Sequence, residues 1–172
     1  MLDYPDYRNH CRWMERAIAL ADQAGQAGDV PVGAVVVRNG VAIAEAANRR
    51  ERDRDPTAHA EVLALRSAGQ RLNTWHLTDC TLYVTLEPCP MCAGAIILAR
   101  LGLLVYGADD RKAGAVRSVL NLPDSDCSNH ALSVIGGILE PLCQQQLQTW
   151  FAQRRAAPRR PHPPHDTPKT VP

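Results

Sequence analysis

Aromatic residues and long apolar runs are both scarce in this sequence. Aromatic residues make up 5% of its 172 residues and Phe151 is the one phenylalanine, so the core must be mainly aliphatic. Apolar runs such as residues 93–99 are much shorter than the roughly 20 residues that a membrane-spanning helix needs. The N-terminal stretch 1–16 is polar and lacks the apolar centre of a secretion signal. We therefore expect a cytoplasmic protein with no membrane partner.

A large excess of charge of either sign is also missing, since 19 basic residues stand against 18 acidic ones. The balance is uneven, because residues 154–172 hold five arginine or lysine residues and one aspartate. The stretch 156–172 is rich in proline and has no apolar periodicity, and such a composition cannot bury enough surface to fold. We predict one domain over residues 1–155 and a disordered tail over 156–172. A weak nucleic-acid contact of this tail stays open beside the simpler interpretation, a solvated tail.

The rest of the sequence alternates between helical and strand patterns. Asn39-Gly40 separates two β-branched apolar runs, which is a strong hairpin signal. Residues 48–55 are expected to form a charged loop, and 107–131 to be mostly loop with at most one short helix. Helices are predicted over 6–27, 58–68, 90–101 and 141–155, and strands over 32–37, 41–46, 81–86, 103–106 and 133–135. This order predicts a mixed sheet covered by helices.

A disulfide framework is the weaker interpretation of the six cysteines, because the sequence has no secretion signal. Cys89 and Cys92 form a Cys-x-x-Cys pair, with one proline before it and one inside it, at the predicted start of a helix. This spacing turns both sulfurs the same way, and a helix N-terminus favours thiolate over thiol. The other four are isolated in the sequence and are expected to be small buried hydrophobes: Cys11, Cys80, Cys127 and Cys143.

His59 adds an imidazole to these two thiols. Three nitrogen or sulfur donors suit Zn²⁺, and three protein ligands with a fourth position left for water are the pattern of a catalytic zinc site. Glu61 shares a helical turn with His59, so it can act as a base on that water without being a ligand. Each feature alone has a simpler explanation: a redox pair, a helix-dipole partner or a buried core histidine. The combination favours catalytic zinc bound by His59, Cys89 and Cys92.

Several longer stretches carry a resemblance to a known group of enzymes. They are DVPVGAVVV at 29–37, Asn48, DPTAHAEVLALR at 55–66, TLYVTLEPCPMCAGAI at 81–96 and VYGADDRKAGA at 105–115. The sequence resembles the cytidine and deoxycytidylate deaminase superfamily, whose His-x-Glu and Pro-Cys-x-x-Cys signature it contains. Within that superfamily, residues 8–155 are similar to the bacterial tRNA-specific adenosine deaminases.

The resemblance implies an α/β fold, namely a three-layer α/β/α sandwich with a five-stranded mixed sheet, and a homodimer with one zinc ion per subunit. The implied reaction is hydrolysis of adenosine to inosine at the wobble position of a tRNA anticodon stem-loop. Glu61 would move protons between the zinc-activated water, the purine N1 and the leaving ammonia.

The resemblance also implies which residues hold the base. Asn48 would hydrogen-bond the flipped base, Val30 and Pro31 would pack on its face, and the backbone amide of Ala60 would contact it. Simpler interpretations remain for these residues, because Asn48 suits a turn and Val30-Pro31 suits the start of a strand.

One departure and two rival functions accompany this resemblance. Asp109 precedes Asp110-Arg111-Lys112 where the family usually has an arginine, and an acid there should weaken one phosphate contact. The first rival is a deaminase of a free base or nucleoside such as guanine, which shares the zinc signature. The second is a zinc-stabilised binding module without catalysis, against which Glu61 argues, since a structural site does not need an unliganded acid.

Overall fold

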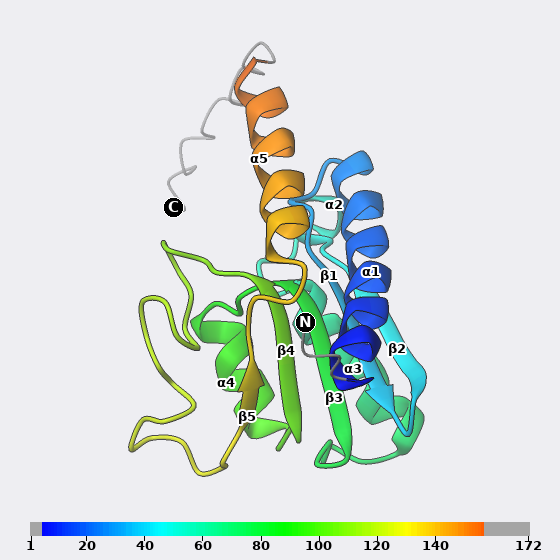
Figure 1. Ribbon diagram of the computed structural model, residues 1–172, viewed down its shortest axis with the longest axis vertical. Coiled ribbons are helices and arrows are strands. Elements are labelled where there is room, and N and C mark those ends of the chain that lie inside the picture. The colour runs from blue at the N-terminus through cyan, green and yellow to red at the C-terminus, as the bar shows by residue number, and fades with distance from the viewer. Residues whose placement is uncertain (1–4, 157–172) are drawn as a thin grey trace, which may run out of the picture.

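The computed structural model describes residues 5–156, and a five-stranded mixed sheet forms its centre (Figure 1). The spatial order of the strands is β2-β1-β3-β4-β5. Strand β1 is antiparallel to β2 and β3, whereas β3, β4 and β5 run parallel to one another. The strands are β1 (Gly33–Arg38), β2 (Val41–Ala47), β3 (Cys80–Leu86), β4 (Leu103–Ala108) and β5 (Ser133–Ile135). The predicted mixed sheet and all five predicted strands are confirmed.

Helices cover both faces of the sheet and make the predicted three layers. Figure 1 shows α1 (Pro5–Gln26) and α5 (Glu140–Ala156) on the near face, and α3 (Ala60–Leu72) and α4 (Pro90–Leu98) on the far face. The three inner strands, β1, β3 and β4, therefore have two buried faces, whereas the edge strands β2 and β5 are partly exposed. Alternate residues of β1 point to opposite sides, with Ala34 and Val36 in the core under α3 and Val35 and Val37 in the core under α1.

The core is aliphatic, as the scarcity of aromatic residues predicts. The core between the sheet and α3 and α4 holds Tyr106 as its one aromatic residue. Trp13 of α1 and Tyr83 of β3 lie in the other core, between α1 and the sheet. Phe151, by contrast, is 42% exposed on α5. The cysteine prediction holds for the buried Cys80 and Cys143, but Cys127 is an exposed thiol, because it lies in the long loop before β5.

The hairpin predicted at Asn39-Gly40 is confirmed. Both residues have positive φ angles, 51° and 70°, as a two-residue turn matched to the twist of the strands requires.

Three stretches of the chain differ from the predicted elements. The charged stretch 48–55 contains a short helix, α2 (Arg50–Asp53), because the buried carboxylate of Asp29 accepts the backbone N–H of Glu51 at 2.7 Å. Helix α3 continues to Leu72, where Asn73 takes a left-handed conformation and ends it. Residues 107–131 contain no helix.

Helix α4 ends at Leu98, earlier than predicted. Arg100 has a positive φ of 52°, and the N–H of Leu77 bonds to the carbonyl oxygen of Ala99 at 2.9 Å. The connection before β3 thus contacts the C-terminal end of α4. The sequence around α4 does not predict this contact, because Leu77 lies more than 20 residues before that end.

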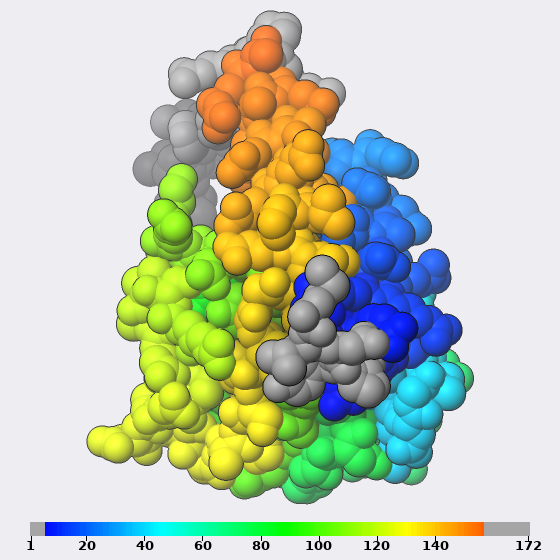
Figure 2. Space-filling model, in the orientation of Figure 1, coloured from blue at the N-terminus to red at the C-terminus, as the bar shows by residue number. Residues whose placement is uncertain are grey.

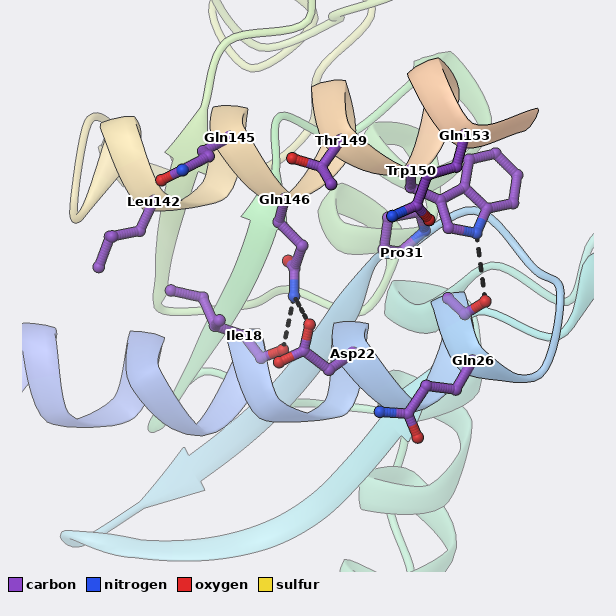
Figure 3. A pocket seen from close by; sticks show the side chains of 11 residues that line it. Ile18, Asp22, Gln26, Pro31, Leu142, Gln145, Gln146, Thr149, Trp150 and Gln153 are labelled. Carbon is purple, nitrogen blue, oxygen red and sulfur yellow. Dashed lines mark hydrogen bonds between the residues drawn. The ribbon is translucent and has the colours of Figure 1, made fainter. Parts of the chain in front are cut away.

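Helix α5 lies beside α1 and ends at Ala156 (Figure 2). Its Gln146 donates to the carbonyl oxygen of Ile18 at 3.1 Å and to a carboxylate oxygen of Asp22 at 2.6 Å (Figure 3). The predicted tail lies beyond this helix, outside the described residues, so the domain limit at 155 stays a prediction. Within residues 5–156 no helix is both long and apolar enough to cross a bilayer.

Candidate active site and metal centre

The three predicted metal ligands converge at the starts of two helices. His59 immediately precedes α3, Cys89 immediately precedes α4, and Cys92 lies in the first turn of α4. Nδ1 of His59 is 3.7 Å from Sγ of Cys89 and 3.5 Å from Sγ of Cys92. All three donor atoms lie within 4.8 Å of one another. A single cation can therefore contact all three side chains.

The backbone at both helix starts fixes the direction of these side chains. His59 and Cys89 are extended, with ψ angles of 148° and 171°, and each accepts the first hydrogen bond of the helix that follows. Pro90 occupies the first position of α4, where the missing N–H costs nothing. The sequence signals for helix starts thus place the ligands as predicted.

The electrostatics of the cluster favour a thiolate at Cys89. The pKa of Cys89 is lowered to about 4, mainly because the thiol of Cys92 donates to it and also because His59 does. The pKa of Cys92 is raised, first by this hydrogen bond to Cys89 and then by burial. The pKa of His59 is raised by its hydrogen bond with Cys89. One thiolate is thus present at neutral pH, in a cluster that shares its protons.

Glu61 lies in the first turn of α3 beside this cluster and is 4% exposed. Burial raises the pKa of its carboxyl group, and the nearby Cys89 raises it further. The carboxyl also contacts the side chain of Cys92, while the group of three converging donors does not include it. A carboxyl of raised pKa that is not needed as a ligand can accept and return a proton.

The donor set fits zinc better than a hard cation. Two sulfurs and one imidazole nitrogen are soft or borderline donors, which favour Zn²⁺ over Mg²⁺ or Ca²⁺. Three protein donors also leave room for one more ligand. The structure therefore supports a possible metal site at His59, Cys89 and Cys92.

A pocket of about 180 Å³ opens over this centre. Val30, Asn48 and Ala60, three of the predicted base-binding residues, line it together with His59 and Glu61. Asn48 donates from Nδ2 to the carbonyl oxygen of Val30 at 3.1 Å. Its Oδ1 is buried and has no hydrogen-bond partner within the described part of the chain, so it is available to accept from a bound molecule.

Pro31 is placed differently from its predicted companions. It lines a hollow of about 480 Å³ between α1 and α5, together with Trp150 and Gln146 (Figure 3). It is not among the residues that line the 180 Å³ pocket. The structure therefore does not place Pro31 in the pocket where a base was predicted to contact it. Of this pair, only Val30 lines that pocket.

Sequence reasoning missed several residues of the pocket wall. The most important of them is Glu87, an acidic residue that is only 1% exposed. Burial alone would raise its pKa, but hydrogen bonds from Ser118, Arg117 and Asp110 hold the pKa below its ordinary value. The one sequence signal was its place before Pro88-Cys89, which does not show what it contacts. The other pocket residues that were not predicted are Val32, Arg50, Leu86, Asp110 and Ala113.

The fold and the site together define a deaminase with the cytidine deaminase-like architecture. The chain belongs to the MafB19-like deaminase family, whose sequence profile matches residues 8–150. A tRNA-specific adenosine deaminase of Bacillus subtilis is 46% identical over 143 residues, which are 83% of this chain and 89% of that protein.

Two solved structures bear on the choice of substrate. One, from biochemical and structural studies of A-to-I editing by tRNA:A34 deaminases at the wobble position of transfer RNA, aligns with a TM-score of 0.77 and 43% identity. This alignment covers 79% of this chain and 99% of that chain. A guanine deaminase from Nitrosomonas europaea aligns with a TM-score of 0.68 and 27% identity, over 81% of this chain and 82% of that chain.

Proposed function

We propose that this protein hydrolyses adenosine to inosine at the wobble position of a tRNA anticodon. The observation that carries the proposal is the higher identity to proteins named for tRNA, 46% and 43%, than to the guanine deaminase at 27%. The chemistry is common to both groups, so the substrate is decided by the residues around the pocket. Deamination of a free base such as guanine remains the alternative to be tested.

One zinc ion per subunit is part of this proposal, held by His59, Cys89 and Cys92. When bound, zinc supplies a Lewis acid that makes a water molecule acidic enough to act near neutral pH. Glu61 would take up one proton from the attacking water and deliver it to N1 of the purine. It would then take the second proton from the hydroxyl group formed at C6 and pass it to the amino group, which leaves as ammonia. Its burial against the cluster and its raised pKa suit both roles.

Three pocket residues are proposed to hold the base. The free Oδ1 of Asn48 accepts a hydrogen bond from the bound nucleoside, while its Nδ2 stays on the carbonyl oxygen of Val30. The side chain of Val30 packs against the face of the base, and the backbone of Ala60 lies between the metal ligand and the proton shuttle. A pocket of about 180 Å³ suits one base with the rest of the RNA outside.

A homodimer completes the proposal, with α4 as the contact helix. The sequence of α4, PMCAGAIIL, is apolar around its whole circumference, and such helices are normally buried on all sides. Leu98 is nevertheless 68% exposed, and Trp75, which lines the same hollow, is 61% exposed. A second copy of the chain that covers this surface would remove the mismatch. Because its substrate is tRNA, the cytoplasm is the proposed location.

The decisive experiment is inosine formation. Purified protein is incubated with an anticodon stem-loop that carries a wobble adenosine, and separately with guanine, adenosine and cytidine, and both ammonia and nucleoside composition are measured. Inosine in the stem-loop alone is the expected result. Ammonia from free guanine alone would reject the tRNA proposal and leave the zinc chemistry intact.

The matched control is Glu61→Gln, which keeps the size of the side chain and removes its acid. It is expected to retain zinc and to lose about 10²- to 10⁴-fold in kcat, the usual contribution of a general acid–base group. Retained zinc with no activity separates proton transfer from metal binding. Full activity in this variant would remove Glu61 from the mechanism.

A further inference from the structure

Glu87 is a buried carboxylate that the proposed chemistry does not use. Within residues 5–156, its side-chain hydrogen bonds all go to the segment 110–118. Oε1 accepts the consecutive backbone N–H groups of Val116, Arg117 and Ser118, at 3.1, 2.7 and 2.9 Å. Oε2 accepts the N–H of Asp110 at 3.1 Å and the hydroxyl of Ser118. Bonds to an ionised carboxylate are stronger than bonds between neutral groups.

The backbone around Glu87 is joined to the same segment. The N–H of Ala115 donates to the carbonyl oxygen of Pro88 at 2.9 Å, directly before the ligand Cys89. A Cβ atom at Gly114 would collide with the carboxylate of Glu87, so this position requires glycine. Ala115 and Val116 are buried as well. One side of the segment is thus fixed to the turn that carries a metal ligand.

The other side of the segment faces the space where substrate is proposed to lie. Asp110 and Ala113 line the pocket over the metal centre. Asp110, Arg111 and Lys112 also line an adjoining hollow of about 610 Å³, which shares Val30 with that pocket. Asp110 lines both hollows, so their walls are continuous at this residue. Its backbone N–H donates to the carboxylate of Glu87.

We infer that Glu87 is a positioning residue, which fixes the 110–118 segment against the Cys89 turn and so sets the wall that contacts RNA next to the reacting base. This inference rests on the proposed function. It assigns Glu87 an effect on substrate binding, because the carboxylate acts through the segment and not on the reacting atoms. A merely structural role would instead lower stability or the active fraction, leaving KM unchanged.

The test compares Glu87→Gln and Ser118→Ala with the wild type. An amide has one acceptor oxygen, so in either orientation some backbone N–H groups of the segment face an NH₂ group. Ser118 is exposed, and its change to alanine removes one hydrogen bond without opening the core. The matched control is Asp79→Asn, an exposed acid paired with Arg38 just before β3.

The readouts are KM and kcat on the anticodon stem-loop, zinc content, and hydrogen exchange of residues 110–118. Glu87→Gln is expected to raise KM about tenfold and Ser118→Ala about threefold, in line with lost charged and neutral hydrogen bonds, with kcat and zinc content nearly unchanged. Faster hydrogen exchange should be confined to 110–118. Asp79→Asn should match the wild type.

Three results would overturn the inference: unchanged KM in both variants, loss of zinc in Ser118→Ala, or unchanged hydrogen exchange in the segment. If Glu87→Gln fails to fold, the inference is tested by the KM of Ser118→Ala and by hydrogen exchange of residues 110–118 in that variant. If the wild type does not act on the stem-loop, the proposed function fails. The exchange measurement then still shows whether Glu87 fixes the segment.

Discussion

His59 Nδ1 lies 3.5 Å from Sγ of Cys92, although the two residues are 33 positions apart in the chain. The N-termini of α3 and α4 meet at this point. Glu61 follows His59 in the same turn and reaches the side chain of Cys92. The possible metal donors and the proposed proton shuttle are therefore positioned by two helix starts, which are more rigid than loops.

Removing one of the three donors should remove the metal. Cys92→Ala is expected to lower zinc affinity by more than about 100-fold, because even residues that only orient a ligand often account for a 10- to 100-fold effect. Zinc content after dialysis, measured by atomic absorption, checks this. The control is Cys127→Ala, since Cys127 is an exposed thiol far from the cluster in sequence, and it should keep its zinc. Full zinc content in Cys92→Ala would refute the ligand assignment.

The proposed dimer can be tested at the exposed face of α4. Leu98→Glu places a charge where a second chain would pack, so we expect a shift from dimer to monomer in analytical ultracentrifugation. The thermal midpoint of the monomer should change little, because Leu98 is 68% exposed in the single chain. Leu142→Glu changes an exposed leucine on α5 and should stay dimeric. Equal masses for the two variants would argue against this surface.

Stability should depend on pH through His10. Burial lowers the pKa of His10, with Asp6 opposing, and its Nδ1 lies 2.9 Å from the hydroxyl of Tyr83. A lowered folded-state pKa means that the unfolded chain binds the proton more readily, so this stability is present above the ordinary value of 6.5 and is lost as pH falls below it.

Urea unfolding at pH 7.5 and pH 5.5 is the measurement for His10. When the pH is lowered from 7.5 to 5.5, the free energy of unfolding should fall more in the wild type than in His10→Gln, because glutamine does not titrate. An identical loss in both proteins would show that His10 does not contribute to the pH dependence.

The packing of α1 on the sheet depends on Gly33. A Cβ atom there would collide with the carbonyl oxygen of Ala17 and lie 2.6 Å from the backbone nitrogen of Ala21. Gly33→Ala should therefore cost about 1–3 kcal/mol of unfolding free energy, as overpacking does, measured by urea titration. Gly94→Ala is the control, since a Cβ atom there meets nothing within 4 Å. It should gain about 0.5–1 kcal/mol in α4. Equal effects would contradict the packing argument.

Short-range sequence patterns determined the elements and the metal donors. Asn39-Gly40 gave the hairpin because few other dipeptides tolerate two positive φ angles. Pro90 after Cys89 gave the start of α4, and the spacing of Cys89 and Cys92 within one turn gave two converging sulfurs. His59 with Glu61 added the third possible donor and the proposed proton shuttle. Each of these patterns spans about one helical turn, so each can be found without the fold. Only the fold shows that His59 lies beside the two cysteines, which are 30 and 33 positions away in the chain.

Contacts between distant segments decided the rest. Asp29 bound the backbone of Glu51 and made a helix from a stretch that looks like a charged loop. Pro31 lies next to Val30 in sequence, yet it faces the hollow between α1 and α5, whereas Val30 faces the pocket. The carboxylate of Glu87 found its partners 23 to 31 residues away. A buried polar group must be satisfied, but the sequence does not state by which partner, so only the tertiary structure could show that Glu87 holds the pocket wall.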